Sequence, residues 1–105
     1  MRVLAFVPDL MDRSRLRAPG AEVVFVSDPS ELVGAEADLV VLDLSRPGVV
    51  EALPGITALT VGFSSHVDEA TIRAAADAGC GEVCTRSVFF RRFPELVGSD
   101  GRAGG

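Results

Sequence analysis

Short apolar runs alternate with segments of helical pattern along the whole chain. The apolar runs are bounded mostly by proline, glycine or polar residues, which predicts five strands; they cover residues 2–7, 22–27, 39–44, 56–63 and 82–85. The helical segments between and after them are short; they cover residues 10–18, 28 to between 34 and 37, 49–53, 67–78 and 88–97. Regular alternation with short connections predicts an α/β fold, a doubly wound parallel sheet with helices on both faces.

The run from Leu39 to Leu42 is followed by Asp43 and then by turn residues. An unbroken apolar run of this length predicts a strand buried on both faces, at the centre of the sheet. A carboxylate beside such a strand is costly unless it is hydrated, paired or bound to a cation. Ligands of open α/β sheets bind at the carboxyl ends of the strands. Asp43 is therefore the first candidate for a functional residue.

The length and the net charge of the chain limit the functions that it can have. A chain of 105 residues forms one domain, and the glycine-rich polar segment 98–105 predicts a flexible C-terminal tail after a domain of residues 1–97. The net charge of −5 argues against a nucleic-acid partner. No apolar run reaches the roughly 18 residues of a membrane helix, and the N-terminal run is too short for a signal peptide. We expect a cytoplasmic protein.

Polar residues follow four of the predicted strands. Asp9 comes after the first strand, Asp43 after the third, Ser64 after the fourth and Arg86 after the fifth. Parallel strands would bring all four to one edge of the sheet. Two carboxylates could hold a hard divalent cation there, while a hydroxyl and a guanidinium could stabilise the charge of a transferred phosphoryl group.

The chain resembles the response-regulator receiver domain, the chemotaxis-regulator-like family. The resemblance covers nearly the whole chain before the tail; it is carried by segments 38–48, 62–68, 74–79 and 82–86 and by the 22-residue gap between Ser64 and Arg86. It implies a flavodoxin-like sheet of order 2-1-3-4-5. It further implies Asp43 as phosphoacceptor, Ser64 and Arg86 as phosphate contacts, and Asp9 with Asp43 as ligands of Mg²⁺. The partner would be a histidine kinase or an output protein in two-component signalling.

The sequence also departs from the family pattern. Receivers carry two adjacent acidic residues after the first strand, whereas this chain has only Asp9 there, unless Asp12 substitutes from the following helix. Arg86 stands where the family has lysine, Ser87 stands where it has proline, and several helices are short. Loss of a carboxylate weakens a Mg²⁺ site. These departures are similar to those of atypical receivers, or pseudo-receivers.

The leading hypothesis is a stand-alone, non-enzymatic signalling module that acts through protein contacts, with phosphorylation weakened or lost. One alternative is a working aspartate phosphoacceptor. Another is a small flavodoxin-like ligand-binding domain, although no glycine-rich phosphate loop follows the first strand.

Each candidate residue also has a purely structural interpretation. Asp43 could stabilise a turn, Asp9 could cap the helix that follows it, and Ser64 could cap the next helix through a capping box over 64–68. Arg86 could form a structural ion pair with Asp43. Three phenylalanines within five residues cannot all face one side of a helix, so we expect one or two to be exposed at a partner or dimer surface; they are Phe89, Phe90 and Phe93.

Overall fold

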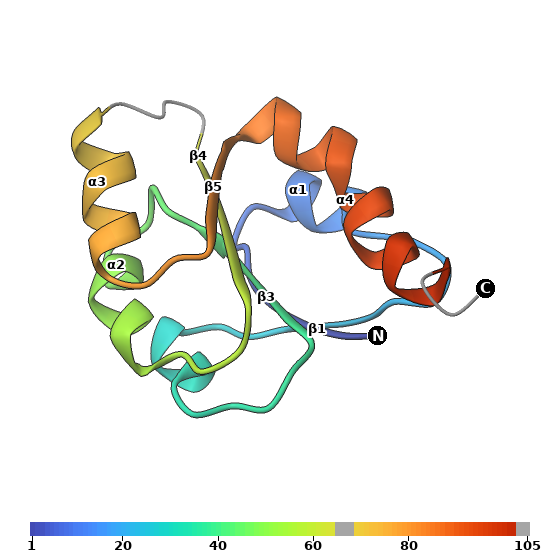
Figure 1. Cartoon of the computed structure of the whole chain (residues 1–105), viewed down its shortest axis with the longest axis horizontal. Helices are drawn as coiled ribbons and strands as arrows, with labels where there is room; N and C mark the ends of the chain where they lie inside the picture. The colour runs from blue at the N-terminus through green and yellow to red at the C-terminus, as the bar shows by residue number, and fades with distance from the viewer. Residues whose placement is uncertain (65–68, 103–105) are drawn as a thin grey trace.

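The computed structural model describes residues 1–64 and 69–102, with side chains described as far as Val97 (Figure 1). In chain order the elements are β1 (Arg2–Phe6), α1 (Leu10–Arg15), β2 (Glu22–Phe25), η1 (Pro29–Leu32), β3 (Leu39–Asp43), α2 (Val49–Ala52), η2 (Leu53–Gly55), β4 (Thr60–Ser64), α3 (Glu69–Asp77), β5 (Glu82–Thr85) and α4 (Arg86–Arg102). None of the helices in this part of the chain has the length and apolarity needed to span a membrane.

The five strands form one sheet of order β2-β1-β3-β4-β5, and every neighbouring pair is parallel. Both the predicted fold class and the strand order are confirmed. Because all strands run the same way, their carboxyl ends lie along one edge. Asp43 pairs in register with Phe63, and Ser64 pairs with Thr85.

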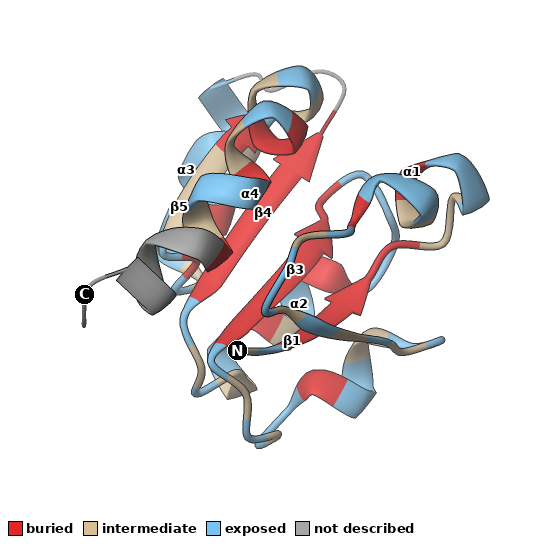
Figure 2. Cartoon of the chain, turned by 90° about the vertical axis from the view of Figure 1, so that its right-hand side faces the viewer, coloured by how far each residue is buried: buried red, intermediate tan, exposed pale blue. Residues whose placement is uncertain are grey.

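The core has two layers, one on each face of the sheet (Figure 2). On one face α4 and the residue that follows α1, Leu16, cover the strands. On the other face η1, α2 and α3 cover them, with Leu32, Val49 and Ala75 fully buried. All five residues of β3 are buried, as predicted for the central strand.

Several element boundaries differ from prediction. The first helix ends at Arg15 rather than 18, and β4 begins at Thr60 rather than 56. The delay of β4 follows from Pro54-Gly55, which continues α2 as the 3₁₀ turn η2 instead of starting an extended strand. The last helix runs to Arg102 rather than 97, because a helix anchored by its first turns gains a hydrogen bond with each added residue. Residues 98–102, predicted to begin a flexible tail, therefore belong to the last helix. The predicted helix start at 67–68 and the rest of the predicted tail, 103–105, lie outside the described residues.

The expected exposure of the phenylalanine cluster is wrong. Phe89 and Phe93 are fully buried, and Phe90 is only 7% exposed. The Phe89 ring stacks on Phe63 with a centroid distance of 4.9 Å. Phe90 points to a different side of α4, where it meets the edge of Phe63 and is covered by the Arg15 guanidinium, 4.3 Å from the ring centroid. The Arg15 side chain of α1 therefore covers the side of Phe90 that the sequence analysis expected to be exposed.

Candidate functional site

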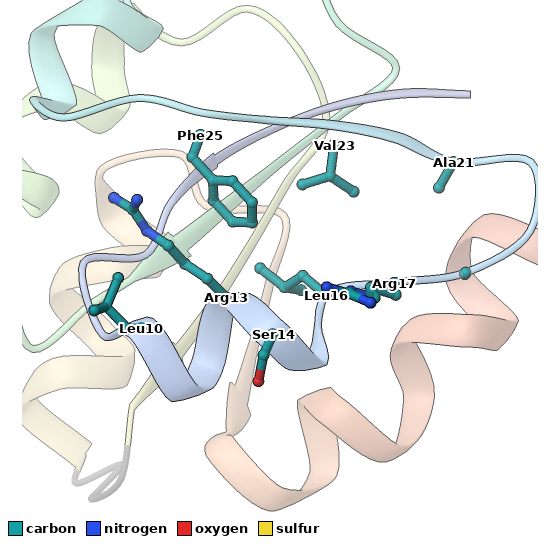
Figure 3. Close-up of a pocket in the computed structure, with 9 residues that line it drawn as sticks. Leu10, Arg13, Ser14, Leu16, Arg17, Ala21, Val23 and Phe25 are labelled. Carbon is teal, nitrogen blue, oxygen red and sulfur yellow. The ribbon is translucent and has the colours of Figure 1, made fainter.

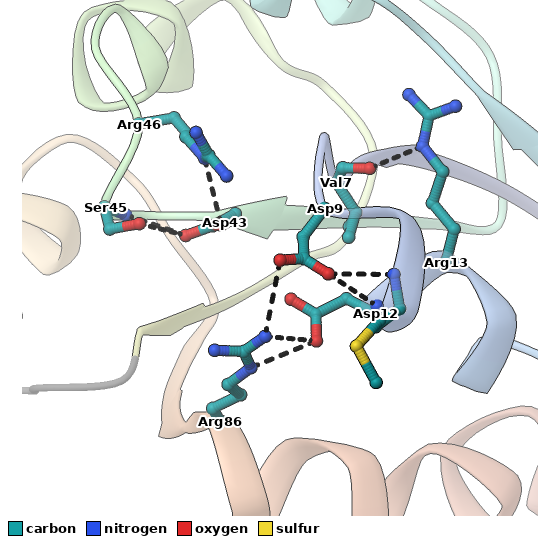
Figure 4. Close-up of polar contacts among 9 residues, drawn as sticks. Val7, Asp9, Asp12, Arg13, Asp43, Ser45, Arg46 and Arg86 are labelled. Carbon is teal, nitrogen blue, oxygen red and sulfur yellow. Dashed lines mark hydrogen bonds and ion pairs between the residues drawn. The ribbon is translucent and has the colours of Figure 1, made fainter.

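The four predicted site residues lie at the carboxyl edge of the sheet. Asp43 and Ser64 are the last residues of β3 and β4, Arg86 directly follows β5, and Asp9 precedes α1 just beyond β1. Figure 4 shows Asp9, Asp43 and Arg86 in one region, joined there by Asp12. The parallel topology thus brings together residues that are up to 77 positions apart, from Asp9 to Arg86.

Arg86 is bound by Asp12, a residue of α1. Its Nη2 and Nε atoms donate to Asp12 Oδ1 at 2.5 and 3.0 Å, and its Nη2 lies 3.9 Å from Asp9 Oδ2. The hydrogen bonds to Asp12 raise the pKa of Arg86, and the charges of Asp12, Asp9 and Asp43 act in the same direction. The Asp12 side chain is only 3% exposed. The pair therefore fixes a buried carboxylate beneath a half-exposed guanidinium.

Asp9 is the N-cap of α1. Its Oδ1 accepts the backbone N–H groups of Met11 and Asp12 at 2.8 and 3.1 Å. The bond from the Asp12 backbone N–H does most to lower the pKa of Asp9, and Arg86 and Arg46 lower it further. The structural interpretation of Asp9 as a helix cap is therefore confirmed, and only Oδ2 is directed toward Arg86 (Figure 4).

Asp43 is held by the turn that follows β3. Its Oδ1 accepts the backbone N–H and the hydroxyl of Ser45 at 3.0 and 2.6 Å, and its Oδ2 accepts from Arg46 Nε at 3.4 Å. The side chain is 9% exposed. Both carboxylate oxygens therefore already have donors. The interpretation as a turn residue is confirmed, whereas the predicted ion pair with Arg86 is replaced by Asp12 because α1 brings Asp12 nearer to that guanidinium.

Ser64 is buried at the end of β4, with 6% of its surface exposed. Its neighbour Phe63 pairs in register with Asp43, which places Ser64 at the same edge. No hydrogen bond joins its hydroxyl to Asp43 or Arg86 among the described residues. The rest of the proposed capping box, residues 65–68, lies outside the described residues.

Sequence reasoning missed Ser45 and Arg46 as partners of Asp43. The signal was present, because an aspartate followed two residues later by serine is typical of a side-chain-stabilised turn. Asp12 was recognised as a substitute carboxylate, but its pairing with Arg86 across 74 positions had no local signal.

The carboxylates of this edge are paired with guanidinium groups rather than left free for a divalent cation. Mg²⁺ takes free oxygen ligands in a near-octahedral arrangement. Here Asp12 and Asp9 face Arg86, and Asp43 faces Arg46. The part of the chain that the structure describes contains no group of three or more metal-ligating side chains. Guanidinium charges neutralise the carboxylates where a metal would be expected to do so.

Solved structures of response regulators match this chain over almost its full length. A response regulator from Hahella chejuensis gives a TM-score of 0.78 at 18% identity, covering 92% of each chain. The response regulator domain of Thermotoga maritima CheB gives 0.72 at 25% identity, covering 98% of this chain and 95% of that one. The phosphorylated cyanobacterial phytochrome response regulator RcpA gives 0.72 at 19% identity, covering 93% and 89%. No protein-family description and no curated protein sequence matches the chain.

These matches define the class of the protein. The sheet order and the helices on both faces are those of the flavodoxin-like receiver fold. The chain has the fold of a response-regulator receiver domain, and the resemblance predicted from its sequence is confirmed.

Proposed function

We propose that this chain is an atypical receiver: a non-enzymatic, cytoplasmic signalling module that acts by binding a protein partner, with phosphorylation of Asp43 weakened or lost. The single observation that carries the proposal is the pairing of the carboxyl-edge acids with arginines. Asp43 is bonded to Ser45 and Arg46, and Asp12 is bonded to Arg86. A receiver working through Asp43 would need that carboxylate free to attack.

Both the hydrogen bonds of Asp43 and the charges around it disfavour attack on a phosphoryl group. An attacking carboxylate oxygen uses a lone pair, and Asp43 Oδ1 already accepts two hydrogen bonds from Ser45. Phosphoryl transfer is catalysed mainly by positioning and by neutralising the transferred oxygens. A metal ion supplies much of that neutralisation in receivers, and the carboxylates that would hold it here are paired with guanidinium groups. Attack through Oδ1 would therefore require a Ser45 bond to break, and attack through Oδ2 would require the Arg46 contact to loosen, in each case without a metal to compensate.

Two structural neighbours provide a contrast. RcpA was solved in phosphorylated form, and the response regulator Rcp1, 14% identical to this chain, was solved with Mn²⁺ bound. The Asp9–Asp12–Arg86 arrangement supports a different behaviour for this chain. Its partner would be a histidine kinase or an output protein, recognised through the surface of the domain.

The test is incubation of the full chain with acetyl phosphate and Mg²⁺, followed by intact-mass measurement and peptide mapping. We expect no detectable covalent phosphate on Asp43. The variant Arg46→Gln keeps a hydrogen-bonding side chain but removes the charge that pairs with Asp43 Oδ2, so we expect it to acquire more phosphate than the parent. Asp43→Asn serves as the control that defines the background.

Near-complete phosphorylation of Asp43 in the parent chain would overturn the proposal and favour the alternative, a working phosphoacceptor.

Beryllofluoride with Mg²⁺ provides a second readout. We expect no change in the amide chemical shifts around Asp43 and Arg86, whereas large shifts there would also count against weakened phosphorylation.

A further inference from the structure

A groove lies between α1 and the edge strand β2, away from the paired acids. Its volume is about 520 Å³, within the range of roughly 300–1,000 Å³ typical of ligand sites. Figure 3 shows the side chains of Val23 and Phe25 directed from β2 toward Leu16, which follows α1. Because α1 ends at Arg15, this part of the sheet is only partly covered, and Val23 and Phe25 remain half-buried.

Two arginines stand at opposite ends of this groove (Figure 3). Arg13 donates from Nε to the Val7 carbonyl oxygen at 2.7 Å, and its guanidinium lies 5.0 Å from the centre of the Phe25 ring. Its remaining N–H groups point away from that bond. Arg17 lines the groove beside Leu16 and forms no ion pair among the described residues. The groove is thus cationic at both ends in a protein whose net charge is −5.

The open side of the groove is the free edge of the sheet. β2 pairs with β1 alone and is the last strand on its side of the order. Extended peptides bind other domains by adding a strand to such an edge, where main-chain hydrogen bonds give affinity and pockets for alternate side chains give specificity. Here the edge strand β2 offers the main-chain hydrogen-bonding groups, and the partly apolar groove beside it offers a pocket for side chains.

We infer that the α1–β2 groove binds an extended segment of a partner protein with an acidic–x–apolar–x–acidic pattern, added as a sixth strand beside β2. Alternate residues of a strand face the same side. An apolar residue placed opposite Val23 would enter the groove between Leu16 and Phe25. Residues two positions to either side would lie opposite Ala21 and Phe25, beside Arg17 and Arg13. Two carboxylates four residues apart therefore match the two guanidiniums.

This inference deepens the proposed binding role and rests on it. Charge complementarity decides the nature of the partner segment. A neutral apolar strand would contact Leu16, Val23 and Phe25 but would offer no carboxylate to Arg17 or to the remaining N–H groups of Arg13. A basic strand would be repelled.

The test uses an ¹⁵N-labelled sample of the full chain and a capped synthetic heptapeptide, Thr-Glu-Thr-Leu-Thr-Glu-Thr. Amide chemical shifts are followed during titration. We expect saturable shifts confined to residues 10–25 of α1, β2 and their connection. The same peptide with both glutamates replaced by glutamine should bind about tenfold more weakly, because it loses the charge-assisted hydrogen bonds.

Arg17→Gln removes one guanidinium without touching the Arg13–Val7 bond, and we expect it to weaken binding of the glutamate peptide about fivefold to tenfold and to leave binding of the glutamine peptide unchanged. Arg73→Gln, on α3 at the other face of the sheet, is the matched control and should change neither. Unchanged thermal unfolding would show that both variants fold.

Equal binding of the two peptides, equal effects of the two variants, or no binding would overturn the inference. Shifts that cluster at another surface would also overturn it, yet leave the general binding role standing. Phosphorylation of Asp43 is measured separately by mass, so failure of the groove and failure of the proposed function remain distinguishable.

Discussion

At the scale of single residues, arginine side chains neutralise the acids at the carboxyl edge. A guanidinium presents several N–H donors in a rigid plane and stays charged, so it can bond a carboxylate from two directions. Arg86 does so with Asp12 through Nε and Nη2. Asp12 is nearly inaccessible to water, whereas the Arg86 side chain is 40% exposed. Loss of the ion pair would therefore cost the buried Asp12 carboxylate more free energy than the partly exposed Arg86 guanidinium.

Replacing Arg86 with methionine should destabilise the fold by leaving Asp12 buried without a cationic partner. Breaking a fully buried pair costs roughly 3–5 kcal/mol, and the partial exposure of Arg86 reduces the expected loss to about 2 kcal/mol. The measurement is the free energy of unfolding in urea. Asp12→Asn combined with Arg86→Met should recover about half of the loss, because the neutral amide costs less to bury.

Arg91→Met, an exposed change on the same helix, is the control and should shift the free energy of unfolding by less than about 0.5 kcal/mol. If the double variant were no more stable than Arg86→Met alone, the buried charge would not be the cause of the loss.

At the scale of elements, the pattern of apolar runs was sufficient to predict every strand, whereas the order of the strands in the sheet came from the resemblance to receiver domains. It was less informative about where elements end. The fourth strand was predicted to begin at residue 56, directly after Pro54-Gly55, yet these two residues belong to the 3₁₀ turn η2 and β4 begins only at Thr60. Local propensity could not reveal this, because the turn is fixed by burial of Leu53 against the second core layer.

The packing of α4 shows a similar limit. Helical periodicity cannot place Phe89, Phe90 and Phe93 on one side of a helix, and this expectation about their directions is correct. The missing information was tertiary: Arg15 of α1 covers Phe90, while Phe63 of β4 contacts both Phe89 and Phe90. A residue on the flank of a helix is buried when a second helix lies beside it.

Replacing Phe89 with alanine should weaken the packing of α4 on the sheet. We expect it to lower the free energy of unfolding more than the substitution of any exposed residue. Removal of a fully buried phenylalanine costs roughly 3–5 kcal/mol through lost transfer energy and the cavity that remains. We expect a loss in this range, measured by urea unfolding, with a smaller loss for Phe89→Leu. Leu59→Ala, at a side chain that is 63% exposed, should cost less than about 1 kcal/mol. A loss below 1 kcal/mol for Phe89→Ala would contradict the observed stacking on Phe63.

At the scale of the whole molecule, the topology determines which residues meet. Sequence reasoning placed Asp9, Asp43, Ser64 and Arg86 at one edge because parallel strands share a direction, and the structure places them there. The sequence could not show which carboxylate pairs with each guanidinium, since that depends on how α1 lies relative to the first residue of α4. The pairing of Arg86 with Asp12 was therefore found only in three dimensions.

The charge balance of the edge leads to a prediction about Mg²⁺. Three carboxylates, Asp9, Asp12 and Asp43, face two guanidiniums, Arg46 and Arg86, so only one negative charge is left to attract a cation. We expect 10 mM MgCl₂ to leave the thermal unfolding midpoint of the parent chain unchanged relative to NaCl of equal ionic strength.

The combined variant Pro8→Asp and Arg86→Lys should acquire a response to Mg²⁺. It adds a carboxylate next to Asp9 and replaces the forked guanidinium with a more flexible point charge that can move away from the acids. A metal that binds only the folded state stabilises it according to its concentration relative to Kd, by about 1.8 kcal/mol at twenty times Kd. A higher unfolding midpoint in Mg²⁺ for this variant alone would show that arginine pairing, together with the missing carboxylate, excludes the metal. An equal rise in the parent chain would show that the paired carboxylates still bind it.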